Sequence, residues 1–145
     1  MRVELERFDE VLAIVRREFP HLAIEVDRNH KQVDAIADLP PQPGLDFLVS
    51  FNLQGDALHL HASKLWVEMF PCGKQRVFEA FVDAMRGLLS GHFRILESYV
   101  GKHSATAFLQ RPEKGTWKTV ASSSNLWAVL PWRRTNRVVQ NSERS

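Results

Sequence analysis

Two histidines spaced two residues apart form the first candidate for chemistry in this chain. His59 and His61 alternate with leucines in a segment typical of a strand. Side chains two apart on a strand project from one face, about 7 Å apart at the backbone, so the two imidazoles could share a metal ion. A site needs a third ligand, and the expected register places only Asn52 and Ser50 opposite the pair. An exposed polar sheet face explains the same pattern, so both interpretations stay open.

The segment from Gly73 to Arg76 is the second candidate, because it places a glycine and two cations at the expected start of a helix. Lys74 and Arg76 oppose the helix dipole there, at a cost of about 0.3 to 1 kcal/mol each. The free N–H groups of a first helical turn can bind phosphate or carboxylate, so Gly73, Lys74 and Arg76 could hold an anion. The segment lacks the glycine spacing of a nucleotide-binding loop, and solvated cations are the simpler interpretation.

The only cysteine, Cys72, immediately precedes that helix start. The helix dipole would lower the pKa of its thiol and make the sulfur more nucleophilic. A nucleophile also needs a base within hydrogen-bond reach, which one sequence cannot place. A lone cysteine is more often a small buried hydrophobic residue.

The third candidate lies near the carboxyl end, where Leu126 to Arg134 holds two of the four tryptophans beside a basic pair. Trp127, Trp132, Arg133 and Arg134 are residue types that suit contact with a partner protein or a membrane surface. A terminal strand or short helix that buries both indole rings against the body is the simpler alternative, and it is the one we expect.

Motifs of the enzyme classes that a sequence reveals most directly do not occur in this chain. There is no GxSxG, HExxH, GxGxxG, phosphate-loop or zinc-finger spacing. We therefore predict no catalytic residues and no cofactor. A protein without enzymatic activity is favoured, although an enzyme whose site is assembled from scattered residues would leave no motif.

Composition and charge narrow the remaining classes. The chain has 145 residues, 44% hydrophobic and 25% charged, as in a globular protein. Its net charge is +2, but the last thirteen residues carry +3, so the rest is about neutral and duplex nucleic acid is not an expected partner. A single cysteine, an acidic amino-terminal segment and no run of roughly 18 apolar residues predict a cytoplasmic protein without a transmembrane segment.

Hydrophobic periodicity predicts the elements that must position these residues. Apolar residues at spacings of three and four predict amphipathic helices over residues 3–19 and 75–90. Two-residue alternation predicts strands at 22–26, 33–39, 45–54, 58–62 and 65–70, and three more at 93–100, 105–110 and 116–121. A turn at Gly55 and Asp56 pairs Leu53 with Leu58, and Val49 with Ala62.

This order predicts an α+β fold in which two amphipathic helices pack on one face of a mostly antiparallel sheet. One helix, four or five strands, a second helix and three strands follow one another. In element order alone, this resembles the small α+β folds of secretion chaperones. We expect a single domain over residues 1–132 and a basic, disordered tail over residues 133–145.

Two classes of function remain open, because a resemblance in fold does not carry function. The favoured class is a non-catalytic protein-binding module, acting as a chaperone, as an inhibitor or immunity partner, or as a homodimer. The alternative is a small metal- or anion-binding protein or enzyme that uses His59 and His61 or the helix start.

Overall fold

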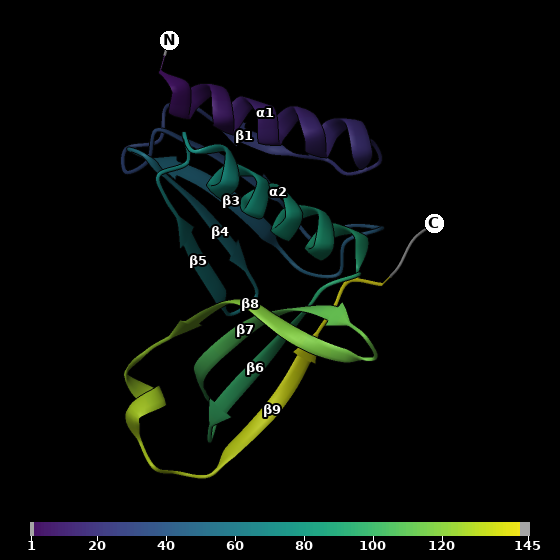
Figure 1. The fold of residues 1–145 in the computed structure, drawn as a ribbon, viewed down its shortest axis with the longest axis vertical. Helices are drawn as coiled ribbons and strands as arrows, with labels where there is room; N and C mark the ends of the chain where they lie inside the picture. The colour runs from purple at the N-terminus through teal and green to yellow at the C-terminus, as the bar shows by residue number, and fades with distance from the viewer. Residues whose placement is uncertain (1, 143–145) are drawn as a thin grey trace.

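The computed structural model describes residues 2–142 as two antiparallel sheets and two helices (Figure 1). Along the chain, the elements are α1 (Val3–Glu18), β1 (Glu25–Asp27), β2 (Ala35–Leu39), β3 (Val49–Gln54), β4 (Ala57–Ala62), β5 (Leu65–Met69), α2 (Gln75–Ser90), β6 (Arg94–Val100), β7 (His103–Glu113), β8 (Thr116–Ser124), the 3₁₀ turn η1 (Leu126–Val129) and β9 (Arg134–Val139). The predicted α+β class is confirmed. Neither helix in the described part of the chain is long and apolar enough to cross a membrane.

The strands form two sheets, which corrects the expected single sheet. The first sheet has the order β1-β2-β3-β4-β5, and the second has the order β8-β7-β6-β9. Loops of two to nine residues connect neighbouring strands before α2, and two-residue turns connect β6, β7 and β8 after it. Each group therefore pairs locally, and the hydrophobic alternation that predicts the strands does not reveal that the groups stay separate.

The central hairpin of the first sheet has the predicted register. Leu53 pairs with Leu58, and Val49 with Ala62, so the apolar side chains of β3 and β4 share one face. The chain reverses after Ala62 through Ser63, whose φ of 52° is in the left-handed region. This turn brings Leu65 back to the buried side, where Leu58 and Leu60 also lie.

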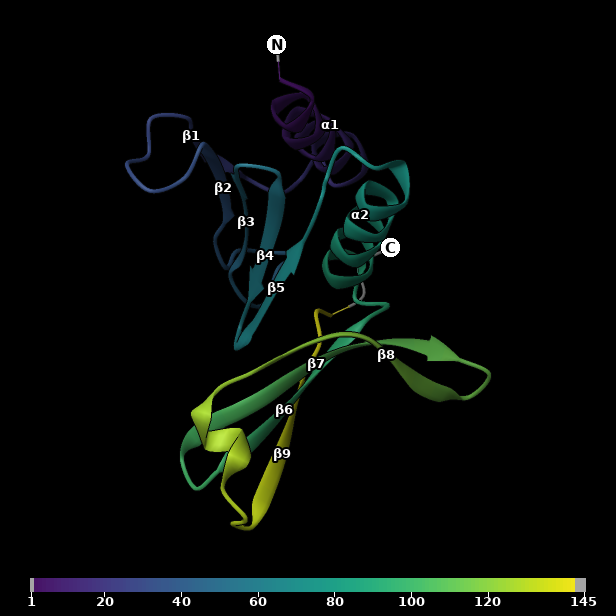
Figure 2. The same ribbon diagram turned by 60° about the vertical axis from the view of Figure 1, so that its left-hand side comes forward.

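Both helices cover the same face of the first sheet (Figures 1 and 2). Three fully buried phenylalanines connect the layers, since Phe8 of α1, Phe51 of β3 and Phe81 of α2 form a chain of ring contacts. The ring centroids of Phe8 and Phe51 are 5.2 Å apart, and those of Phe51 and Phe81 are 6.3 Å apart. The helix pair is thus packed on the sheet through aromatic side chains.

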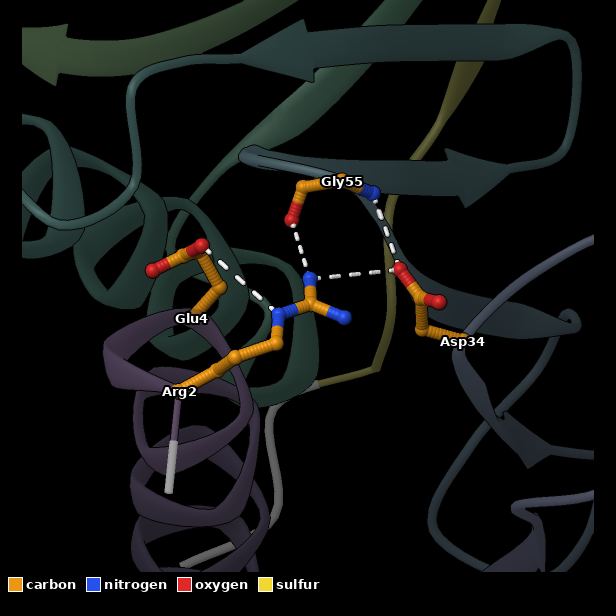
Figure 3. Close-up of polar contacts among 4 residues, drawn as sticks. All are labelled: Arg2, Glu4, Asp34 and Gly55. Carbon is orange, nitrogen blue, oxygen red and sulfur yellow. Dashed lines mark hydrogen bonds and ion pairs between the residues drawn. The ribbon is translucent and has the colours of Figure 1, made fainter.

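The start of α1 is attached to the first sheet by polar contacts (Figure 3). Arg2 donates from Nη2 to the carbonyl of Gly55 at 2.9 Å, and the same atom lies 3.4 Å from Oδ2 of Asp34. Asp34 also accepts the N–H of Gly55 at 2.9 Å. The Gly55 N–H, with Arg2 second, lowers the pKa of Asp34, because both favour its charged form.

The end of α2 leads the chain into the second sheet through a close contact. A Cβ atom on Gly87 would lie 2.2 Å from the ring of Phe93, so only glycine lets the aromatic side chain pack on the helix here. Gly91 follows at the helix end with a φ of 83°, the left-handed conformation that stops helices.

A buried carboxylate joins the two sheets. Glu97 of β6 has no solvent-exposed surface. It accepts hydrogen bonds from Ser63 Oγ at 2.6 Å, from the backbone N–H of Lys64 at 3.1 Å and from the hydroxyl of Tyr99 at 2.7 Å. The turn between β4 and β5 is therefore fixed against the middle of the second sheet.

Strand β9 corrects the expected disordered tail. Arg134–Val139 pair with β6, where Val139 lies opposite Ile95 and packs against the core. Beyond the strand, buried Asn141 donates to the carbonyls of Gly44 and Leu89 and accepts the N–H of Asp46. The arginines of this segment suggest disorder, but the segment is ordered because it pairs with the edge of β6 and because Asn141 bonds to distant backbone groups. Residues 143–145, the remainder of the predicted tail, lie outside the described residues.

Candidate functional site

The two histidines of the predicted metal pair lie on the face of the first sheet that the helices do not cover (Figure 2). His59 is only 5% exposed and its ring is 5.2 Å from that of Trp66, whereas His61 is exposed. Nδ1 of His59 has no hydrogen-bond partner in the described structure. Asn52 lies opposite His59 on one side, as predicted, and Glu68 on the other. Across residues 2–142, no three His, Cys, Asp or Glu side chains gather to hold a metal ion, so the pair lacks a third ligand.

The start of α2 exposes all three residues of the predicted anion site. Gly73, Lys74 and Arg76 are exposed, and Lys74 occupies the N-cap without a side-chain capping bond. Arg7 of α1 reaches this turn and donates to the carbonyl of Gly73 at 3.2 Å and to the side chain of Gln75 at 3.1 Å. The turn therefore carries three cationic side chains.

Cys72 is fully buried beneath this turn. Burial, with the nearby carboxylate of Glu4 second, raises the pKa of its thiol. The helix dipole had suggested the opposite direction, but desolvation disfavours the thiolate more strongly here. Cys72 is thus a small buried residue, which agrees with the simpler of the two interpretations.

Strand β5 is an edge strand of the first sheet and lies beside this turn, so part of its backbone is open to pairing with another strand. Trp66 and Phe70 are 50% and 60% exposed on or next to this edge strand. The N–H of Trp66 points away from β4 and donates to Ser123 Oγ of β8 at 3.2 Å. In an antiparallel ladder the outward direction recurs every second residue, so the N–H and C=O of Glu68 face the same side.

A groove lies between this edge and α2. One cavity of about 340 Å³ is lined by Glu68, Met69, Phe70, Arg76, Val77 and Ala80. Met69 and Ala80 also line a second cavity of about 120 Å³, which continues toward Phe93 and Val120 of the second sheet. The walls of both are mainly apolar, and Arg76 places a charge at the end nearest the start of α2. The sequence signal for this surface is that β5 is apolar on both faces.

The aromatic segment near the carboxyl end lies at the end of the second sheet far from the helices (Figure 1). We call residues 101–103 and 125–134 the sheet tip. Leu126, Val129 and Trp132 are 84%, 79% and 59% exposed, so the expected burial of this segment against the body is wrong for these side chains. Trp127 is half-buried because its ring stacks on His103, with centroids 3.9 Å apart. The expectation fails because η1 follows β8 to the end of the sheet, where no other layer covers it.

The tip also holds the predicted basic pair. Arg133 is exposed, and Arg134 donates to Ser98 Oγ at 3.1 Å and to the carbonyl of Ala128 at 2.7 Å. Trp132 lies 6.4 Å from Trp127, measured between ring centroids. The structure therefore brings all four predicted partner-binding residues to one end of the molecule.

Charge is divided between the two layers. Residues 1–92 contain fourteen acidic and ten basic side chains, whereas residues 93–145 contain three acidic and nine basic ones. The two parts thus carry −4 and +6. The near-neutral body inferred from the sequence conceals this division, because the boundary only becomes evident when the sheets are seen to be separate.

No protein-family model matches this chain, and no curated protein and no solved structure matches it significantly. What the chain binds must therefore be inferred from its own surfaces.

Proposed function

We propose that this protein is a non-catalytic module that binds an extended segment of another protein along β5. The observation that carries the proposal is the outward-facing backbone of Glu68 on the edge strand β5, which lies beside an apolar groove and between the exposed side chains of Trp66 and Phe70, whereas the N–H of Trp66 is already bonded to Ser123. An edge strand presents unpaired backbone groups, and proteins usually charge or cover such edges. Here Glu68 is the only charge between the exposed aromatic residues Trp66 and Phe70.

The partner segment adds a strand to the edge. Its backbone pairs with the N–H and C=O of Glu68, while alternate side chains enter the groove between Met69 and Ala80. In such strand addition, the main-chain hydrogen bonds supply affinity and the side-chain pockets supply specificity. An acidic residue at the end of the segment would meet Lys74 and Arg76, which gives the predicted anion site a role within the same surface.

A second copy of this chain is a less suitable occupant. A twofold antiparallel pairing of β5 that sets Trp66 opposite Phe70 of the other copy also sets Glu68 opposite Glu68. Like charges directly opposed across strands are destabilising. We therefore propose a different protein as partner. We also propose that the two proteins meet in the cytoplasm, because a single buried cysteine forms no disulfide within the chain and suits a reducing compartment.

Selection of short random peptides displayed on phage tests the proposal. The wild-type protein should enrich sequences with apolar residues at alternate positions followed by an acidic residue. Ala80→Trp fills the groove from an exposed helix position and should abolish the enrichment. Glu79→Trp, on the same helix but outside the groove lining, is the matched control and should select the same peptides. Equal enrichment by wild type and Ala80→Trp, or none by wild type, would contradict the proposal.

A further inference from the structure

We propose that the sheet tip docks on an anionic membrane surface, with Leu126 and Val129 inserted between the lipids. This interaction is separate from strand addition at β5. It rests on three features of the tip: its exposed aliphatic side chains, the stacked indole of Trp127 and its uniformly basic charge.

The aliphatic side chains of η1 are the most exposed large hydrophobic residues in the described structure. Leu126 is 84% exposed and Val129 is 79% exposed. The η1 turn that carries them lies at the end of the molecule opposite the helices (Figure 1). Exposed apolar groups that protrude at one end can enter the boundary between lipid headgroups and acyl chains, where their removal from water favours binding.

One of the two indoles next to them, that of Trp127, is held in place. Trp127 stacks on His103 with an angle of only 4° between the rings. Asn125 fixes the start of η1, since its side chain accepts the N–H of Trp127 and donates to the carbonyl of Ser104. Tryptophan favours the headgroup depth of a bilayer, where its ring is apolar and its N–H stays solvated. Insertion of this prearranged tip loses little conformational entropy.

The charges around the tip have one sign. Between residues 98 and 142 the only acidic residue is Glu113, which ends β7 at the hairpin with β8. Lys102, Arg133 and Arg134 lie in the tip itself, and Arg137 follows along β9, opposite Glu97. The apolar side chains of η1 thus lie at the outer end of the second sheet, and Arg137 lies further along β9 toward the first sheet. This order matches the acyl chains and phosphates of an anionic bilayer, and charge complementarity selects such lipids over neutral ones.

Flotation of the full chain with lipid vesicles tests the proposal. Wild-type protein should float with phosphatidylcholine vesicles that contain phosphatidylserine, with a blue shift of tryptophan emission, and should remain behind with phosphatidylcholine alone. Binding should weaken as salt screens the charges. The double variant Leu126→Glu and Val129→Glu should lose about tenfold or more of the vesicle-bound fraction. Both positions are exposed, so thermal unfolding of the variant should match that of wild type.

Phe70→Glu is the matched control, because Phe70 is 60% exposed on the β5 edge and outside the tip. It should leave vesicle binding unchanged and impair peptide selection, which separates the two proposals. Equal flotation of the double variant and wild type would overturn membrane docking. A wild-type protein that stays lipid-free with phosphatidylserine vesicles would also overturn it, and an acidic protein surface would then be the partner that fits the tip.

Discussion

Removal of the Glu97 carboxylate should break the contacts between the two sheets and strongly lower the free energy of unfolding. This side chain is fully buried and accepts three hydrogen bonds, two of them from the turn between β4 and β5. Hydrogen bonds to a charged group contribute about 1.5 to 3 kcal/mol each, and partial rehydration recovers some of the loss. Glu97→Ala should therefore lower the free energy of unfolding by about 3 to 5 kcal/mol, the range seen when one partner of a buried charged contact is removed.

Glu97→Gln supplies the graded comparison. Its amide keeps the volume and one carbonyl oxygen, which can still accept the N–H of Lys64, so the cost should be about 1 to 2 kcal/mol. Urea unfolding followed by tryptophan fluorescence measures both variants, with exposed Glu25→Ala as a control that stays within about 0.5 kcal/mol of wild type. A loss below about 1 kcal/mol in Glu97→Ala would show that the carboxylate does not hold the sheets together.

Three further outcomes follow from the packing and the pKa shifts. Phe51→Ala should cost about 3 to 5 kcal/mol in urea unfolding, because its buried ring contacts both helices. Because the pKa of Asp34 is lowered in the folded protein, its carboxylate stabilises the fold at pH values above the ordinary pKa of 3.8. This stabilisation is lost as the pH falls through the lowered pKa. Asp34→Asn should remove that part of the acid sensitivity, about 1 kcal/mol or less for so exposed a group, in unfolding measured across pH. Cys72 should react with a thiol reagent slowly in the native protein and quickly in urea, because burial raises its pKa.

Local patterns explain which parts of the fold can be predicted from the sequence. The hairpin from Val49 to Ala62 has strict alternation and a two-residue turn, and the two features together fix its register. The helices follow from a three-to-four spacing of apolar residues that matches their buried faces. These signals lie within a few residues of one another, so one sequence contains them in full.

Long-range pairing explains the parts that could not be predicted. Ile95 pairs with Val139, more than forty positions away, and no local feature of either segment identifies the other. The same limit applies to the candidate sites, because exposure depends on which layer covers a residue. Trp127 and Leu126 are adjacent and both apolar, yet one stacks on His103 and the other is almost fully exposed. Composition indicates the chemistry of the segment, and only the fold shows which side chains are free to use it.

The division of charge favours one orientation of the molecule on a membrane, and both proposed interactions are possible in that orientation. If the basic tip of the second sheet meets an anionic membrane, the layer formed by residues 1–92, with its charge of −4, is repelled from the same surface. The molecule would then stand with η1 on the lipid and the helices directed away from it, as the two ends are separated in Figure 1. In that orientation the groove between β5 and α2 stays above the membrane, so a partner strand could bind β5 while the tip remains docked.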